Sequence, residues 1–223
     1  MDTPPKFLTR HPVVKDALSL ILFIGAVIIG TILLNTFVFR SYNVIGGSME
    51  NTLHSDDRII VNRIPVTISH LFGQEYIPSR GQIIVFANGG VGDTLTCEPT
   101  PGIRDQYVIK RVVAFPGEGV TVKDGVLTVY NDEHPDGFHP DDITRISAED
   151  GPKEFTSDQV GVWKDDTLIS PFTVPEGELF VAGDNREGQH SLDSRNGLGT
   201  IPFCRIIGPA AIRLFPFNKI RFF

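Results

Sequence analysis

A serine and a lysine that are far apart in this sequence have the types and surroundings needed for nucleophilic chemistry. Ser48 follows two glycines within residues 45–53, and Lys110 lies within the apolar, β-branched residues 107–115. A serine hydroxyl attacks a carbonyl effectively only when a base accepts its proton. Lysine is such a base only when it is neutral, which requires its pKa, about 10.4 in water, to fall by several units through desolvation. A strand that carries the Lys110 amine into an apolar cleft would meet that condition.

Two other interpretations of the proton acceptor remain open. Lys110 and Arg111 are neighbours on a predicted strand, so their side chains point to opposite faces and one of them is expected to face away from any core. Lys110 would then be a solvated surface lysine. Of the six histidines, His190 is the nearest rival because it precedes Ser191 in a polar segment, and the alternative for His190 is a solvated loop histidine. The sequence contains no Gly-X-Ser-X-Gly nucleophile elbow.

A third polar segment follows near the C-terminus. It begins with Gly183-Asp184-Asn185-Arg186 and ends with Ser191-Leu192-Asp193-Ser194-Arg195. The serine segment, the lysine segment and this segment follow the order found in the type I signal peptidases, which the chain resembles. Residues 80–86 are similar to the strand that lies between the first two motifs in that family. The resemblance covers residues 17–39 and nearly all of residues 40–214, and four short motifs in one order are highly specific.

The resemblance implies a role for each matched residue. Ser48 would attack the scissile carbonyl, and Lys110 would accept its proton and return it to the leaving amine. Ser191 would orient the lysine amine, while Asp193 and Arg195 resemble a structural ion pair beside the site. The other matched residues would support the nucleophile or the loop around it: Met49, Arg111, Asp184, Asn185 and Arg186.

Three positions depart from the family pattern. Gly46, which with Gly47 forms the expected oxyanion region, stands where some members have a serine whose hydroxyl stabilises the oxyanion. The intermediate would then depend more on the backbone N–H of Ser48. Because the loss of one such donor costs about 3–4 kcal/mol, another amide or a water is expected to substitute. Asn51 replaces a common proline, and the link at residues 187–190 is slightly longer than usual.

Residues 17–39 hold no charged side chain. As a helix with a rise of about 1.5 Å per residue, this segment would span a hydrocarbon core of about 30 Å. A cleaved export signal is the alternative, but its apolar region should be only about 7–15 residues long and should end in small residues. Three basic residues precede the segment within residues 1–16, and Arg40 alone follows closely. The length of the segment and its ending in Phe37-Val38-Phe39 therefore predict a retained cell-membrane anchor. The positive-inside rule predicts a cytoplasmic N-terminus and an extracytoplasmic catalytic portion at residues 40–223.

Beyond this segment, short β-branched runs alternate with Gly, Pro and Asp, which indicates strands. The clearest runs are residues 58–62, 82–86 and 106–114. Asp124-Gly125 predicts a hairpin turn within residues 119–130. We therefore expect a mainly β protein. The resemblance implies the signal-peptidase-like fold, in which coiled antiparallel β-sheets follow an N-terminal transmembrane helix, with a cap or insertion near residues 119–178.

Charge and cysteine content bear on several other classes of protein. The formal net charge is −7, and nucleic acid is not an expected partner because affinity for phosphate needs clustered Lys and Arg. Cys97 and Cys204, the only cysteines, would either pair in an oxidising exterior or remain isolated thiols. Zinc-finger spacing and an EF-hand loop are both missing, so neither a metal nor another cofactor is expected.

Two further segments have open interpretations. Residues 89–93 are rich in glycine but lack the Gly-Lys-Ser/Thr ending of a phosphate loop, which favours a turn. The terminal aromatic residues would either enter the bilayer surface or pack on the β-sheet domain, and the sequence favours neither. They are Phe215, Phe217, Phe222 and Phe223.

These observations predict a membrane-anchored serine endopeptidase that uses a Ser48–Lys110 dyad to remove signal peptides from secretory preproteins. The resemblance implies small substrate residues at −1 and −3, the first and third positions before the cut. A self-cleaving Ser-Lys protease and a non-catalytic, anchored β module that binds signal peptides are the alternatives. Substitution of Ser48 would leave the function of such a module intact.

Overall fold

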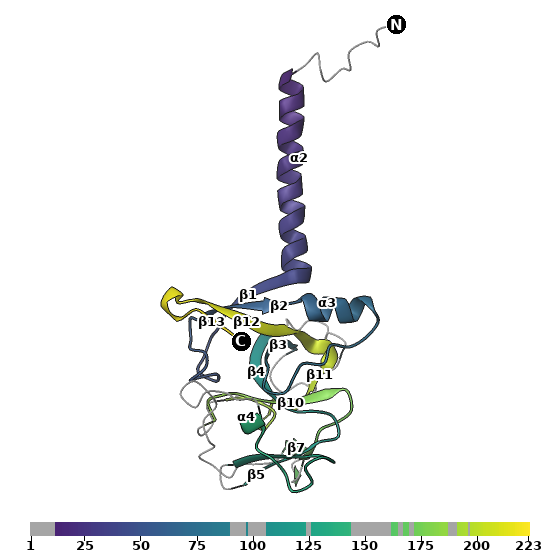
Figure 1. Ribbon diagram of the computed structural model, residues 1–223, viewed down its shortest axis with the longest axis vertical. Coiled ribbons are helices and arrows are strands. Elements are labelled where there is room, and N and C mark those ends of the chain that lie inside the picture. Colours follow the sequence, from purple (N-terminus) through teal and green to yellow (C-terminus); the bar gives the residue numbers. More distant parts are fainter. Residues whose placement is uncertain are drawn as a thin grey trace.

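The computed structural model of the 223-residue chain describes residues 12–89, 97, 106–123, 126–143, 162–164, 167–169, 172–186, 191–195 and 197–223. One long helix stands on a β-rich body (Figure 1). Several predicted features lie outside the described residues: His190, the 187–190 link, the Asp124-Gly125 turn and residues 90–93 of the glycine-rich segment.

The N-terminal helix extends away from the body. Helix α2 covers Pro12–Leu33 and continues as a π-helical turn, η1, over Leu34–Val38. Val13–Val38 is long and apolar enough to cross a membrane by length and composition, and none of its most apolar window is buried inside the protein. This helix is therefore not part of the core of the body. Its apolar side chains need another apolar environment, and its length suits a bilayer.

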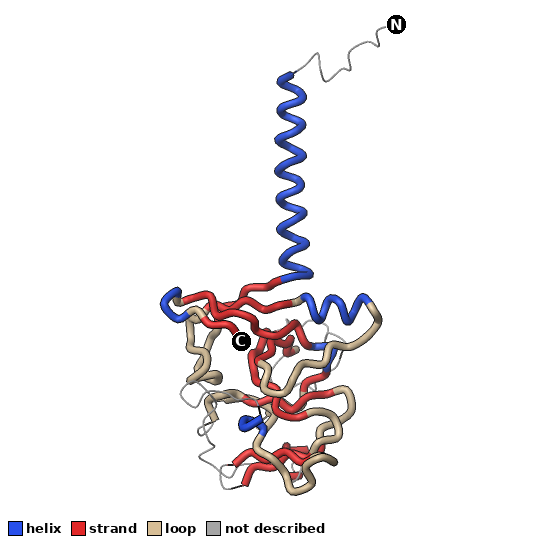
Figure 2. The backbone as a smooth tube through the Cα atoms, viewed as in Figure 1, coloured by secondary structure: helices blue, strands red, loops and turns tan. Residues whose placement is uncertain are grey.

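The body is built on one antiparallel sheet of eight strands (Figure 2). Seven strands follow the order β1-β2-β12-β3-β4-β10-β11, and β13 pairs with β12. Their bounds are β1 Phe39–Asn43, β2 Arg58–Asn62, β3 Ile83–Asn88, β4 Gln106–Ala114, β10 Glu178–Ala182, β11 Ile201–Pro202, β12 Ile206–Phe215 and β13 Arg221–Phe222. The prediction of a mainly β, antiparallel protein with one N-terminal apolar helix is confirmed.

Strand β3 separates two layers of the core. All six of its residues are buried, because both faces of the strand are covered. Ile84 and Phe86 face one hydrophobic cluster, whereas Ile83 and Val85 face another, as the alternation of side chains along a strand requires. The second cluster also includes Met49. The residue after Ser48 is therefore held in the same core as the central strand of the sheet.

A smaller group of strands lies at the end of the body away from α2 (Figure 1). It comprises β5 Gly119–Lys123, β6 Val126–Tyr130, β7 Val162–Lys164, β8 Thr167–Ile169 and β9 Phe172–Thr173, with the short helix α4 at Pro140–Ile143. The predicted hairpin is confirmed, because β5 and β6 pair from Gly119–Tyr130 to Lys123–Val126. These elements fall within the expected cap at residues 119–178, whose boundaries stay a prediction.

Two exposed apolar elements flank the foot of α2. Helix α3, Ile64–Leu71, lies on one side, and the turn η3, Phe217–Lys219, lies near β13 on the other (Figure 1). Phe217 and Phe222 expose 71% and 73% of their surface. These two aromatic side chains are therefore not packed into the β-sheet domain, which removes one of the two alternatives left open for them.

A disulfide joins Cys97 to Cys204, with a sequence separation of 107 residues. The sequence alone left this pairing open. Cys204 lies in the 3₁₀ turn η2, Phe203–Arg205, just before β12. The bond therefore links a residue between β3 and β4 to the turn just before β12, the strand that pairs with β3. A cross-link over so long a loop removes much conformational freedom from the unfolded chain.

We expect Cys204→Ser to lower the free energy of unfolding by about 2–5 kcal/mol, because the closed loop is long. Urea unfolding followed by circular dichroism, with and without dithiothreitol, measures the change. The reductant should destabilise the wild-type protein and leave Cys204→Ser unchanged. Equal effects of dithiothreitol on both proteins would contradict a stabilising disulfide.

Candidate active site

Ser48 lies in the loop between β1 and β2, residues 44–57. The ends of this loop are closed by two backbone hydrogen bonds, from Val44 N to Asp57 O at 2.8 Å and from Asp56 N to Val44 O at 2.9 Å. Gly46 has a φ of +89°, a conformation that side chains with a Cβ rarely adopt. The turn before Ser48 therefore favours glycine at position 46. As a result, this position offers no side-chain hydroxyl as a hydrogen-bond donor.

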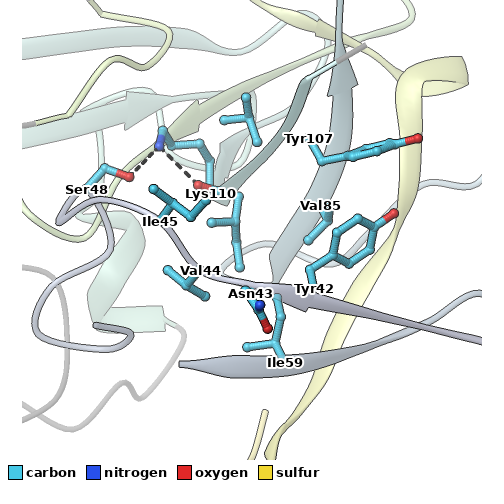
Figure 3. A pocket seen from close by; sticks show the side chains of 11 residues that line it. Tyr42, Asn43, Val44, Ile45, Ser48, Ile59, Val85, Tyr107 and Lys110 are labelled. Carbon is cyan, nitrogen blue, oxygen red and sulfur yellow. Dashed lines mark hydrogen bonds between the residues drawn. The ribbon is translucent and has the colours of Figure 1, made fainter. Parts of the chain in front are cut away.

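Lys110 reaches Ser48 from strand β4. Its Nζ donates hydrogen bonds to Ser48 Oγ at 2.7 Å and to Ile109 O at 3.0 Å (Figure 3). Lys110 is only 3% exposed and Arg111 only 5%. The alternative of a solvated Lys110 is therefore wrong, as is the expectation that one of the two neighbours must face solvent. The strand is covered on both faces, so each side chain points into a buried polar site.

Burial is the main influence on the Lys110 amine, because a charged group loses solvation in a buried site. It lowers the pKa of Lys110 from 10.5 to about 8, against the carboxylates of Asp193 and Asp184, which raise it, and with the help of Arg195, which lowers it. A larger fraction of this amine is therefore neutral near pH 7 than for a solvated lysine. A neutral amine at 2.7 Å from a serine hydroxyl can accept its proton.

Arg111 forms a buried cluster next to the dyad. Its Nε donates to Asp184 Oδ1 at 2.7 Å and its Nη2 to Asp184 Oδ2 at 2.5 Å, while Nη1 donates to Gly81 O at 2.6 Å. Thr52 Oγ1 also donates to Asp184 Oδ2 at 2.5 Å. Because Thr52 belongs to the serine loop, this cluster joins the loop to β4 and to the segment after β10.

The segment after β10 holds the backbone around Ser48. Asn185 N donates to Ser48 O at 3.0 Å, and Asn185 Nδ2 donates to Gly47 O at 3.0 Å. A Cβ added at Gly183 would lie 2.1 Å from Ser191 Oγ and 2.4 Å from Ser48 O. Only glycine at position 183 allows the two segments to approach this closely.

Asp193 and Arg195 form the ion pair expected from the sequence. Arg195 Nε donates to Asp193 Oδ1 at 2.7 Å and Nη2 to Oδ2 at 2.6 Å. Ser191 Oγ donates to Asp193 Oδ2 at 2.8 Å, and Gly183 N donates to the same oxygen at 3.1 Å. Asp193 therefore binds the side chains of Ser191 and Arg195 and the backbone of Gly183. The action of Ser191 on the Lys110 amine stays a prediction.

A cleft of about 330 Å³ opens beside the dyad (Figure 3). Ser48 and Lys110 lie at one end, and Tyr42 and Tyr107 lie at the other. Most of its remaining lining is aliphatic: Val44, Ile45, Ile59, Val85, Val108 and Ile109. β4 pairs with β3 from Gln106 to Arg111 but with β10 only from Arg111 onward. Over residues 106–110 the second edge of β4 is therefore not paired with any described strand.

One group of potential metal ligands lies close together among the described residues. The carboxylate of Glu75 and the sulfurs of Cys97 and Cys204 are within 4.8 Å of one another. The two sulfurs are joined in the disulfide, and zinc binds thiolates rather than disulfide sulfurs. This group is therefore not suited to a metal while the disulfide is intact.

The geometry of a serine, a buried lysine and an apolar cleft agrees with the comparison to known proteins. The sequence model of the family described as "Signal peptidase, peptidase S26" matches residues 16–215. The chain belongs to this family. It is therefore a serine endopeptidase of the signal peptidase I type.

Individual relatives agree with this membership. Signal peptidase I of Bacillus licheniformis is 32% identical over 206 residues, covering 91% of this chain and 92% of the relative. Signal peptidase I T of Bacillus subtilis (strain 168) is 32% identical over 190 residues, covering 85% of this chain and 81% of the relative. A crystal structure of a signal peptidase I from Enterococcus faecalis V583 is 29% identical and matches 60% of this chain and 96% of that chain, with a TM-score of 0.32.

In this signal peptidase, residues predicted from three separate motifs lie together. The structure brings Ser48, Lys110, Arg111, Asp184 and Asn185 into one hydrogen-bonded network. Met49 is completely buried beneath the serine loop. Arg186 points instead to the cap, where its Nη1 donates to Asp141 Oδ2 at 2.5 Å. The roles of these residues in the reaction stay predictions.

Sequence reasoning missed three residues in these contacts: Thr52 bonds Asp184, Asp141 bonds Arg186, and Arg213 bonds Thr52. Thr52 and Asp141 are ordinary polar residues in segments with many others, and no local signal distinguishes them. Arg213 does carry a signal, because it is a charge within the apolar run Ala210–Leu214, yet it is only 8% exposed. A charged residue inside an apolar strand is expected to have a buried partner.

We expect Asp184→Ala to lower the free energy of unfolding by about 3–5 kcal/mol, because Arg111 would be left as an unpaired buried charge. Urea unfolding followed by circular dichroism measures this change. The matched control is Asp132→Ala on the exposed surface, for which we expect a change within about 0.5 kcal/mol. Similar losses for the two variants would show that the buried pair has no special importance.

Proposed function

We propose that the chain removes signal peptides from exported preproteins with a Ser48–Lys110 dyad. The observation that carries the proposal is the 2.7 Å hydrogen bond between Lys110 Nζ and Ser48 Oγ at a buried site. Ser48 Oγ attacks the scissile carbonyl while Lys110 accepts its proton. Lys110 then protonates the leaving amine, and an acyl-enzyme remains. Neutral Lys110 next accepts a proton from the water that attacks this ester and donates it to Ser48 Oγ as the acyl group leaves, which restores the free enzyme.

The oxyanion of the tetrahedral intermediate is assigned to the backbone N–H of Ser48. Gly46 has no side-chain donor, and its φ of +89° explains why a serine is unfavourable there. Asn185 holds the carbonyl groups of Gly47 and Ser48, which fixes the direction of the peptide units around the nucleophile. A fixed N–H stabilises a developing charge without reorganising during the reaction.

The cleft supports an extended substrate. The second edge of β4 over residues 106–110 offers backbone groups to which a peptide can add as a further strand. In an extended peptide, alternate side chains point to the same face, so those at −1 and −3 face one wall of the cleft. The cleft is lined mainly by aliphatic side chains and holds only about 330 Å³, which favours small residues at both positions.

The dyad predicts the activity of three variants on a preprotein with an Ala-X-Ala site. Ser48→Ala and Lys110→Ala should each lower kcat by at least about 10⁴-fold, because nucleophile and base act as a unit. Ser79→Ala, at an exposed serine, should retain wild-type cleavage. Retained cutting in Ser48→Ala would refute the proposal, and no cutting by the wild-type protein would favour a signal-peptide-binding module.

The lowered pKa of Lys110 predicts how the rate of the wild-type reaction depends on pH. Only the neutral amine accepts a proton, so kcat/KM should rise with pH through the pKa of Lys110, about 8, and level off above it. Initial rates at low substrate concentration between pH 6 and 10, in about half-unit steps, measure this profile. A limb centred near the pKa of an ordinary lysine, about 10.4, would contradict a desolvated base.

We also propose that α2 is a retained anchor, with residues 1–16 in the cytoplasm and the body outside the membrane. The chain from the end of the helix at Val38 to Ser48 is ten residues, which can span at most about 35 Å. The site is thus held close to the bilayer, where a translocated signal peptide ends. The anchor would raise the effective concentration of such substrates.

The exposed apolar elements beside the foot of α2 support contact between the body and the bilayer surface. On α3 and the residue after it, Ile64, Ile68, Leu71 and Phe72 are exposed. Near the C-terminus, Phe215, Phe217, Ile220, Phe222 and Phe223 are exposed. Large exposed apolar patches mark interaction surfaces, and the foot of a membrane-crossing helix makes lipid the fitting partner.

Quenching by lipids brominated in their acyl chains tests this contact. In a Trp163→Phe background of the full chain in vesicles, tryptophan introduced as Phe217→Trp should be quenched, because its ring lies at the bilayer surface. The control is Val126→Trp, at an exposed position in the cap. Equal quenching at the two positions, or none at Phe217→Trp, would exclude contact at this surface.

A further inference from the structure

Arg213 is a buried cation that contacts the serine loop from β12, whereas Lys110 contacts the loop from β4. It lies on β12, beside the short strand β13 near the C-terminus (Figure 1), and it is 8% exposed. Its position was not among the residues that the family motifs indicate. A buried guanidinium is stable only when its donors are satisfied, so its partners indicate what it holds.

Two of those partners belong to the serine loop. Nη1 of Arg213 donates to Thr52 O at 3.0 Å and to Asp57 Oδ2 at 3.4 Å. Asp57 Oδ2 in turn accepts from His54 N at 2.9 Å, and Asp57 O accepts from Val44 N at 2.8 Å. Arg213 therefore contacts both the middle of the loop and the residue that closes its base.

Thr52 is held between two arginines from two strands. Its hydroxyl is bound to Asp184, the partner of Arg111 on β4, while its carbonyl is bound to Arg213 on β12. Thr52 lies four residues after Ser48, and Leu53 N donates to Met49 O at 2.8 Å within the same turn. Movement of Thr52 is therefore transmitted to the backbone of the nucleophile.

A third partner connects the loop to the C-terminal segment. Nε of Arg213 donates to Lys219 O at 2.8 Å, at the end of the turn η3, which carries the exposed Phe217. One side chain thus bonds both the serine loop and the apolar segment proposed to contact the bilayer. The guanidinium of Arg213 must itself be fixed in order to hold the loop. The bond from its Nε to Lys219 O fixes it from the side of the C-terminal segment.

We infer that Arg213 is a positioning residue for the Ser48–Lys110 dyad. It acts through Thr52 and Asp57 and does not touch the substrate. The inference rests on the proposed dyad and adds a residue from β12 to it. Loss of the guanidinium would loosen residues 44–57, move Ser48 Oγ away from Lys110 Nζ and admit water to the amine. Misplacement of a catalytic group by about 1 Å costs up to about a hundredfold in rate.

Loosening of the serine loop would also affect the Lys110 amine. The charged groups that face this amine are Asp193, Asp184 and Arg195, with Arg111 next along the strand. None of them is changed by a substitution at position 213. Since burial is the largest influence on this amine, hydration through a loosened loop would move its pKa upward. A residue that only stabilises the fold would not change the pH profile of molecules that remain folded.

The test compares Arg213→Gln, Arg213→Lys and the control Arg58→Gln in the detergent-solubilised full chain. Arg58 is an exposed arginine next to Asp57 whose Nε donates to Ser41 Oγ. For each variant, kcat and KM on an Ala-X-Ala preprotein, the pH profile and the melting temperature are measured. We expect kcat of Arg213→Gln to fall by about a hundredfold with KM nearly unchanged, and its pH limb to move to higher pH.

Arg213→Lys keeps the charge beside Asp57 but cannot bond Thr52 O and Lys219 O together, so its kcat should be intermediate. Arg58→Gln should match the wild-type protein. Wild-type kcat and pH limb in folded Arg213→Gln would overturn the inference. If Arg213→Gln unfolds below the assay temperature, wild-type values in Arg213→Lys would overturn it instead. Cleavage that survives Ser48→Ala would refute the dyad itself, independently of the Arg213 variants.

Discussion

The structure depends on keeping a lysine amine out of water while every charge near it is paired. Desolvation lowers the pKa of Lys110 to about 8, but the same low-dielectric surroundings make any unpaired neighbour costly. Arg111 is therefore matched with Asp184, and Arg195 with Asp193, each through two hydrogen bonds. Both carboxylates tend to raise the pKa of the lysine, and their pairing with arginines offsets part of that effect.

The sheet order explains how these groups meet. β4 supplies Lys110 and Arg111, its neighbour β10 leads into residues 183–195, and the loop between β1 and β2 brings Ser48 across from the other side of the sheet. The loop is placed by its core residues, since Met49 and Leu53 share a buried cluster with β2 and β3. Apolar packing thus sets the position of the loop, and hydrogen bonds set the direction of the serine.

The same arrangement relates the chemistry to the membrane. β1 begins directly after the helical segment that ends at Val38 and leads within a few residues to the cleft. Tyr42 and Tyr107 line the cleft at the end away from Ser48, with Arg40 stacked on both rings. A chain that leaves a bilayer beside the helix would meet this end of the cleft before reaching the serine. Position, more than tight binding, would then select the substrate.

The sequence by itself determined the mainly β class, the apolar helix and the three polar motifs, because local residue types record each of them. The candidate dyad of Ser48 and Lys110 came from the resemblance of these motifs, in their order, to the signal peptidases. It could not decide whether Lys110 was buried, since period-two alternation predicted that either Lys110 or Arg111 faces solvent. Both are buried because the serine loop and the segment after β10 contact them, through Ser48, Thr52 and Asp184, which is a property of long-range packing. The Cys97–Cys204 bond and the contacts of Thr52, Asp141 and Arg213 likewise join residues far apart in the chain. Only the tertiary structure decided them, because no local pattern encodes which distant strands become neighbours.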